Sequence, residues 1–146
     1  MKITRMTDED WPDVWAIMEP NIRAGETYPY AMDMPEREAH RMWREVTEAA
    51  YVARDDDGNA TGTYYIKPNQ PTLGAHVANC GYLVADSARP QGVGSAIGEP
   101  ASDVGRYRLW QKMGYETVGT LPGAFKHPKH GYVDAYVMFK TLVDTD

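Results

Sequence analysis

Hydrophobic side chains recur at helical spacing near the start of the chain. The residues on one face of this predicted helix are Trp11, Val14, Trp15, Met18 and Ile22. Thr7 suits the N-cap of this helix, and the three acidic residues that follow it suit the first turn. Pro20 predicts a kink in the helix, and Gly25 predicts its end. A second amphipathic helix is predicted from about Pro35, with Trp43 on its apolar face.

Segments rich in β-branched and aromatic residues, or alternating in polarity, predict the strands. They are residues 2–6, 51–54, 60–66, 75–84, 115–120 and 132–140. Residues 55–59 supply turn chemistry, so the second and third strands are expected to form a hairpin. Alternation along 75–84 places Asn79 on the same face as Leu83, as a polar side chain in a strand that we expect to be buried.

A glycine-rich segment follows the strand that ends at Val84. Gly92 and Gly94 allow a tight turn and a close approach to a ligand, and the amides at the start of the next helix favour an anion. Arg89 adds a positive charge beside them. The segment therefore predicts a phosphate-binding loop, although a glycine pair also occurs in ordinary strand-to-helix turns.

Residues 108–115 then predict a helix that ends in Gly114 and Tyr115, followed by a strand. Together with the glycine-rich segment, they resemble the GNAT acetyltransferase superfamily over residues 1–140. The resemblance implies one domain spanning residues 1–146, with an α/β fold whose mixed, mostly antiparallel central sheet is flanked by helices. It also implies acetyl-coenzyme A as the cosubstrate.

The family motif Arg/Gln-x-x-Gly-x-Gly/Ala implies where the cosubstrate binds. The residues that match it or follow it directly, and that would hold the pyrophosphate, are Arg89, Gln91, Gly92, Val93, Gly94 and Ser95. Backbone amides near Leu83 and Val84 are implied for the thioester or the pantetheine arm, and Trp110 is expected to flank the coenzyme. Pro90 replaces a glycine that is common in the family and removes one amide donor.

The chain departs from the family pattern just after this loop. Only thirteen residues, 95–107, separate the loop from the next helix, and they include Gly98, Pro100 and Gly105. A parallel crossover needs about a dozen residues or more, so no residues remain for one strand of the family sheet. Three explanations stay open: a degenerate relative, a swapped homodimer whose partner fills the gap, or a sequence that lacks residues of the natural protein.

The resemblance also suggests catalytic side chains. Acetylation of an amine requires removal of a proton from the amine, a donor for the thioester oxygen and a proton for the departing thiolate. Glu26 is the candidate base, and the Asn79 amide is the candidate partner of the substrate or of the oxyanion. The family's tyrosine acid corresponds to Trp110, whose indole is no acid, so Tyr107 one helical turn earlier is the substitute.

In the family, the connection between the first two helices lines the acceptor side. Tyr28 and Tyr30 lie in this connection and are candidate substrate contacts, with packing of the loop onto the core as the alternative. The predicted reaction is acetyl transfer to the amine of a small molecule or an amino-acid-like substrate. The alternative is a non-catalytic protein that binds acetyl-coenzyme A or another small ligand.

Composition excludes several other classes. The net charge of −6 disfavours a nucleic-acid partner, because such binding relies on a basic surface. The N-terminus has no apolar signal core and no apolar run is long enough to span a bilayer, so we expect a cytoplasmic protein without a membrane partner. Cys80 has no cysteine partner, and the histidines lack the spacing of metal ligands, so no metal is predicted.

Overall fold

The computed structural model describes residues 1–88 and 110–142. The chain divides into two compact units, Met1–Arg89 and Pro90–Asp146, and each is described by itself. The single domain over residues 1–146 stays a prediction. In the described part of the chain, no helix is long and apolar enough to cross a membrane.

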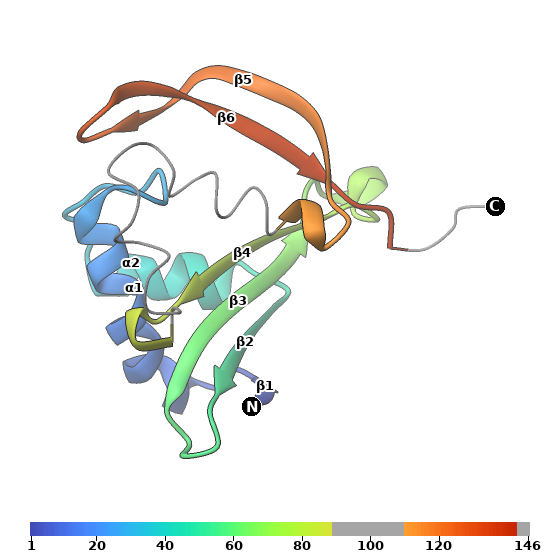
Figure 1. The fold of residues 1–146 in the computed structure, drawn as a ribbon. Coiled ribbons are helices and arrows are strands. Elements are labelled where there is room, and N and C mark those ends of the chain that lie inside the picture. Colours follow the sequence, from blue (N-terminus) through green and yellow to red (C-terminus); the bar gives the residue numbers. More distant parts are fainter. Residues whose placement is uncertain (89–109, 143–146) are drawn as a thin grey trace. The chain divides into compact units, whose positions relative to one another are not determined.

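The first unit contains a four-stranded antiparallel sheet in the order β1-β2-β3-β4 (Figure 1). Its strands are β1 (Lys2–Arg5), β2 (Ala49–Arg54), β3 (Ala60–Pro68) and β4 (Ala78–Val84). The predicted hairpin of β2 and β3 is confirmed, and the Asp55 carboxylate in its turn accepts the backbone N–H groups of Asp57 and Asn59. β4 begins later than predicted, because the 3₁₀ turn η3 (Thr72–Gly74) continues into a turn at residues 75–76.

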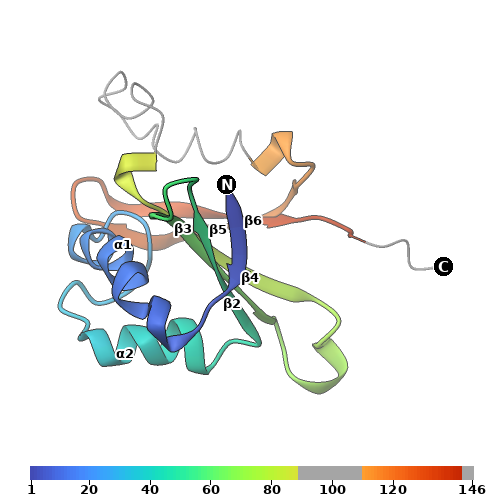
Figure 2. The same cartoon turned by 90° about the horizontal axis from the view of Figure 1, so that it is seen from below.

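Two helical segments pack on one face of this sheet (Figure 2). The turn η1 (Asp8–Asp10) leads into α1 (Trp11–Ala24), which continues through Pro20 and ends at Gly25 in the left-handed conformation, φ 65°. The helix α2 (Glu36–His40) continues as the π turn η2 (Arg41–Glu45). The predicted N-cap position of Thr7 and helix end at Gly25 are confirmed.

The core lies between these helices and the sheet. Its buried apolar residues are Met6, Trp11, Val14, Ile17, Met18, Ile22, Met34, Ala39, Trp43, Ala50, Val52, Tyr65 and Leu83. Trp43 is fully buried, and its indole Nε1 donates to Thr63 Oγ1 at 3.0 Å. On the other face of the sheet, Tyr51, Tyr64 and Tyr82 form a stacked row across three strands.

The second unit contains a hairpin of β5 (Glu116–His127) and β6 (Gly131–Phe139). Residues 110–112 are helical, and Gly114 follows with φ 83°. The predicted end of the strand over residues 115–120 is wrong, because β5 runs to His127 and leaves only a short turn before β6. The register shifts between Leu121 and Phe125, and such an irregularity accommodates Pro122, which has no N–H for a regular ladder.

Candidate functional site

The backbone groups of β4 point alternately toward β3 and toward the outer edge of the sheet. The Ala85 N–H donates to the Thr61 carbonyl at 2.9 Å, and the Val77 carbonyl accepts the Asn69 N–H at 2.8 Å. Odd-numbered residues of this segment therefore face β3. Alternation in an antiparallel ladder directs the N–H and C=O groups of the even-numbered residues to the outer edge.

This orientation distinguishes the two residues predicted to contact the cosubstrate arm. Val84 directs its backbone groups to the outer edge, whereas Leu83 is paired with Thr63 and buries its side chain in the core. Tyr82 shares the orientation of Val84 but was missed from the sequence. The two-residue alternation of a strand is the signal that could have identified it.

Tyr28 reaches this outer edge from the loop after α1. Its hydroxyl accepts the Tyr82 N–H at 2.7 Å and donates to the Tyr82 carbonyl at 2.9 Å. The Tyr28 ring stacks on Tyr30, with centroids 5.2 Å apart, and meets Trp43 edge-on at 5.9 Å. Both loop tyrosines pack against the core, which is the alternative role raised for them above, and their contact with a substrate stays a prediction.

Gly81 permits the close approach of two tyrosines to β4. A Cβ at this position would lie 2.8 Å from Cζ of Tyr65 and 3.0 Å from the hydroxyl oxygen of Tyr28. Burial raises the pKa of Tyr65, with a smaller contribution from Cys80. Burial, and secondarily Tyr65, raises the pKa of Tyr30 to about 12, so Tyr30 is a neutral phenol at physiological pH.

The loop that carries the two tyrosines is tied back to α1. Arg23 donates from Nη1 to the carbonyls of Met32, at 2.7 Å, and Met34, at 3.0 Å. Its guanidinium also lies over the Trp15 ring, 5.8 Å from the centroid. Because Arg23 is on α1, these two hydrogen bonds hold the end of the connection, at Met32 and Met34, against that helix.

The two candidate polar catalytic residues occupy different places in the first unit. Glu26 is half-buried and directly follows Gly25 in the same loop as the tyrosines. Asn79 is exposed, and its Nδ2 donates to Asn69 Oδ1 at 3.3 Å. The expectation that Asn79 is buried is wrong, because within β4 only Gly81 and Leu83 are buried.

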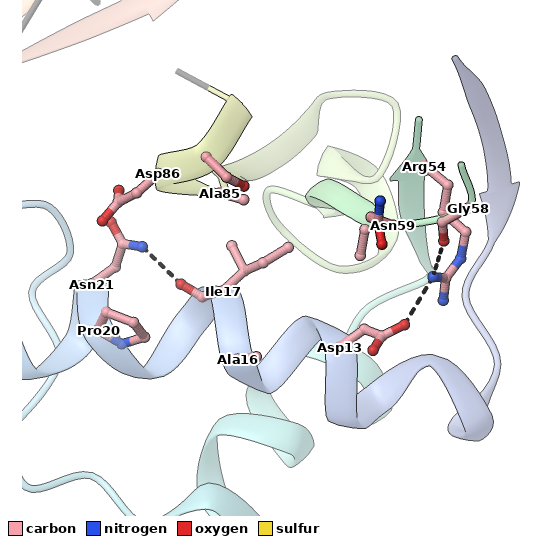
Figure 3. A pocket seen from close by; sticks show the side chains of 12 residues that line it. Asp13, Ala16, Ile17, Pro20, Asn21, Arg54, Gly58, Asn59, Ala85 and Asp86 are labelled. Atoms are coloured by element: carbon pink, nitrogen blue, oxygen red, sulfur yellow. Dashed lines mark hydrogen bonds and ion pairs between the residues drawn. The ribbon is translucent and has the colours of Figure 1, made fainter. Parts of the chain in front are cut away.

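A cleft of about 440 Å³ opens beside the end of β4 (Figure 3). It is lined by α1, by the β2–β3 turn and by the residues after β4, which are Asp13, Ala16, Ile17, Pro20, Asn21, Arg54, Gly58, Asn59, Ala60, Ala85, Asp86 and Ser87. Arg54 binds Asp10 at 2.7 Å and Asp13 at 2.8 Å, which balances its charge. The pKa of Asp10 is lowered, first by the Thr7 N–H and then by Arg54.

Most of the other predicted site residues are not among the described residues. Those outside the described residues are Arg89, Gln91, Gly92, Val93, Gly94, Ser95 and Tyr107, and the shortened region 95–107 is outside them too. Trp110 begins the described part of the second unit and meets Tyr115 edge-on at 5.1 Å. Among residues 1–88 and 110–142, no three side chains of metal-ligating type form a group that could hold an ion.

Comparison with known proteins relates the chain to acetyltransferases. No family model matches it. The fission yeast N-acetyltransferase aca1 is 26% identical over 151 residues, which cover 80% of this chain and 72% of the yeast protein. The alignment is 151 positions long, whereas this chain has 146 residues and only 80% of them are aligned. The yeast protein therefore contains residues within the aligned region that have no counterpart here.

Solved structures share the fold. The phosphinothricin acetyltransferase of Sinorhizobium meliloti, solved in complex with AcCoA, is 18% identical with a TM-score of 0.71, over 94% of this chain and 85% of that one. A GCN5-related N-acetyltransferase from Kribbella flavida is 34% identical with a TM-score of 0.76, over 94% of this chain and 95% of that one. The predicted α/β class, an antiparallel sheet flanked by helices, is confirmed, and the chain belongs to the GCN5-related N-acetyltransferase (GNAT) superfamily.

Proposed function

We propose that this protein transfers the acetyl group of acetyl-coenzyme A to the amine of a small molecule or an amino-acid-like substrate. As a member of the superfamily, it is an acetyl-coenzyme A-dependent acetyltransferase; the nature of the acceptor is the proposal. The observation that supports binding of the cosubstrate is the outer edge of β4, and the acceptor is assigned below to the loop after α1. Along this strand edge, Tyr82 and Val84 direct backbone donors and acceptors outward, just before the predicted phosphate loop.

The chemistry of this edge suits the cosubstrate. A strand edge offers alternating N–H and C=O groups, and an extended chain with amides of its own can pair with them. The arm of acetyl-coenzyme A has two amides and a thioester carbonyl, so Tyr82 and Val84 are the residues proposed to hold it. Residues 89–95 are proposed to hold the pyrophosphate. When bound, acetyl-coenzyme A supplies the activated acetyl group.

The loop after α1 is proposed to receive the acceptor. Glu26 would take the proton from the acceptor ammonium, directly or through a water, because a neutral amine is needed for attack. Tyr28 and Tyr30 would line the acceptor side, and the Asn79 amide would hold the substrate or the carbonyl oxygen. Tyr107 is the proposed proton donor to the departing thiolate.

Turnover of the full chain with a panel of amines tests this proposal. Amino acids, alkylamines and polyamines are each mixed with acetyl-coenzyme A, the liberated thiol is measured with a chromogenic disulfide, and mass spectrometry identifies the acetylated product. We expect thiol and acetylated amine in equal amounts for at least one amine. A reaction without amine gives the background hydrolysis.

Calorimetry separates this proposal from its alternative. Acetyl-coenzyme A should bind saturably to the natural chain, and Gly92→Glu should abolish binding because it places a carboxylate in the proposed anion site. Saturable binding without thiol release for any amine would contradict the enzymatic proposal and support a non-catalytic binding protein. Absence of binding at millimolar concentration would contradict both.

A further inference from the structure

A side chain of the protein itself already hydrogen-bonds to the outer edge of β4. At Tyr82 this edge presents an N–H group that needs an acceptor and a carbonyl that needs a donor. The Tyr28 hydroxyl serves both, at 2.7 Å and 2.9 Å. One hydroxyl therefore imitates, at this position, the paired hydrogen bonds of a neighbouring strand.

This contact is held in place by packing on several sides. The Tyr28 ring lies between Tyr30, on which it stacks at an interplanar angle of 17°, and the buried Trp43. The absence of a side chain at Gly81 gives the hydroxyl room, since a Cβ there would lie 3.0 Å from it. The hydroxyl is thus directed to Tyr82 by its surroundings rather than by a chance rotamer.

We propose that the Tyr28 hydroxyl is a built-in competitor for the arm of acetyl-coenzyme A, which must displace it from Tyr82 in order to bind. The inference rests on the proposed function, because it requires the arm to lie along β4. An amide of the arm offers both an acceptor and a donor, so it can replace both hydrogen bonds of the hydroxyl. The thioester carbonyl offers only an acceptor and can replace one of them.

The competition should lower the affinity of the natural chain for acetyl-coenzyme A by a measurable factor. Binding to the natural chain exchanges the two hydrogen bonds between Tyr28 and Tyr82 for those of the arm, whereas a chain without the hydroxyl does not have to break these two bonds. A net hydrogen bond is worth about 1 kcal/mol, so the loss of one of the two bonds corresponds to about fivefold in affinity and the loss of both to about thirtyfold. We therefore expect Tyr28→Phe to bind acetyl-coenzyme A about five- to thirtyfold more tightly.

Calorimetry of the full chain with two ligands tests the inference. Acetyl-coenzyme A carries the arm, and adenosine 3′,5′-bisphosphate lacks it. Tyr28→Phe keeps the ring and its packing, so it should bind acetyl-coenzyme A about five- to thirtyfold more tightly and the bisphosphate as the natural chain does. The matched control is Tyr51→Phe, which removes the same atom from a ring stacked on Tyr64 on the other face of the sheet and should change neither affinity.

The outcomes are distinct. Unchanged or weaker affinity of Tyr28→Phe for acetyl-coenzyme A would overturn the inference and leave the proposed function standing. Tighter binding of both ligands would also overturn it, because the effect would not come from the arm. If the natural chain binds no acetyl-coenzyme A, the proposed function fails and the inference fails with it.

Amide hydrogen exchange provides a second measurement that does not depend on the affinity of the variant. In the natural chain, the Tyr82 N–H should stay protected when acetyl-coenzyme A is added, because one partner replaces another. In Tyr28→Phe without ligand, its exchange should accelerate, and ligand should restore protection. An unprotected Tyr82 amide in the ligand-bound natural chain would overturn the inference.

Discussion

Replacement of Gly81 by alanine tests the close packing of two tyrosines against β4. The added Cβ would lie 2.8 Å from Cζ of Tyr65, closer still to its Cε1, and 3.0 Å from the hydroxyl oxygen of Tyr28. Tyr65 has little room to retreat, because it is 9% exposed and its ring meets Trp43 edge-on at 4.8 Å. The substitution must therefore displace a buried ring.

The expected loss of stability follows from two opposing effects. Overpacking of a well-packed core costs about 1–3 kcal/mol. Alanine recovers about 0.5–1 kcal/mol, because it restricts the unfolded chain more than glycine does. The difference predicts that the free energy of unfolding falls by about 0.5–2 kcal/mol for Gly81→Ala.

Chemical denaturation followed by tryptophan fluorescence measures this change. Gly119→Ala is the matched control, because a Cβ at Gly119 meets nothing within 4 Å, and we expect its free energy of unfolding to rise by about 0.5–1 kcal/mol. In a Tyr65→Leu background, the cost of Gly81→Ala should fall by roughly half or more, because the clashing ring is gone. If Gly81→Ala has the same free energy of unfolding as the natural chain, the reasoning is refuted.

Two further predictions concern pH. The lowered pKa of Asp10 means that its ionised form stabilises the fold above about pH 4, and that this contribution is lost as the pH falls through the lower folded-state value. In denaturation curves Asp10→Asn should therefore cost less stability at about pH 3 than at pH 7, and an equal cost at both would contradict this. The pKa of Tyr30 is raised to about 12, so the fold keeps its phenol neutral and loses stability as the pH rises from about 10 toward 12. Tyr30→Phe should lose less stability over that interval, and identical pH profiles would exclude the effect.

Features with a local cause were predicted well from the sequence. Thr7 before three acidic residues and Gly25 in the left-handed conformation delimit the first helical segment, since caps depend on residues within one turn. The β2–β3 hairpin was also predicted, because its turn is built from its own residues. Strand limits that depend on partners were predicted poorly, as the extension of β5 through Pro122 shows.

The candidate site was predicted only in part. The loop tyrosines and the end of β4 were selected from the resemblance, but Leu83 was chosen where Tyr82 has the outward backbone groups. The burial expected for Asn79 failed as well, because a sequence pattern gives the face of a strand but not how far the helices cover it. The roles of Glu26 and of residues 89–95 stay predictions.

The sequence by itself determined the order of the elements, the amphipathic faces of the helices and the family, because periodicity, caps and motifs are written in neighbouring residues. Only the tertiary structure decided which backbone groups of β4 point outward and what meets them there. Tyr28 and Tyr82 are far apart in the chain, and their two hydrogen bonds exist because the loop after α1 packs against Trp43 beside a strand in which Gly81 leaves room. That juxtaposition depends on long-range packing, which no local pattern specifies.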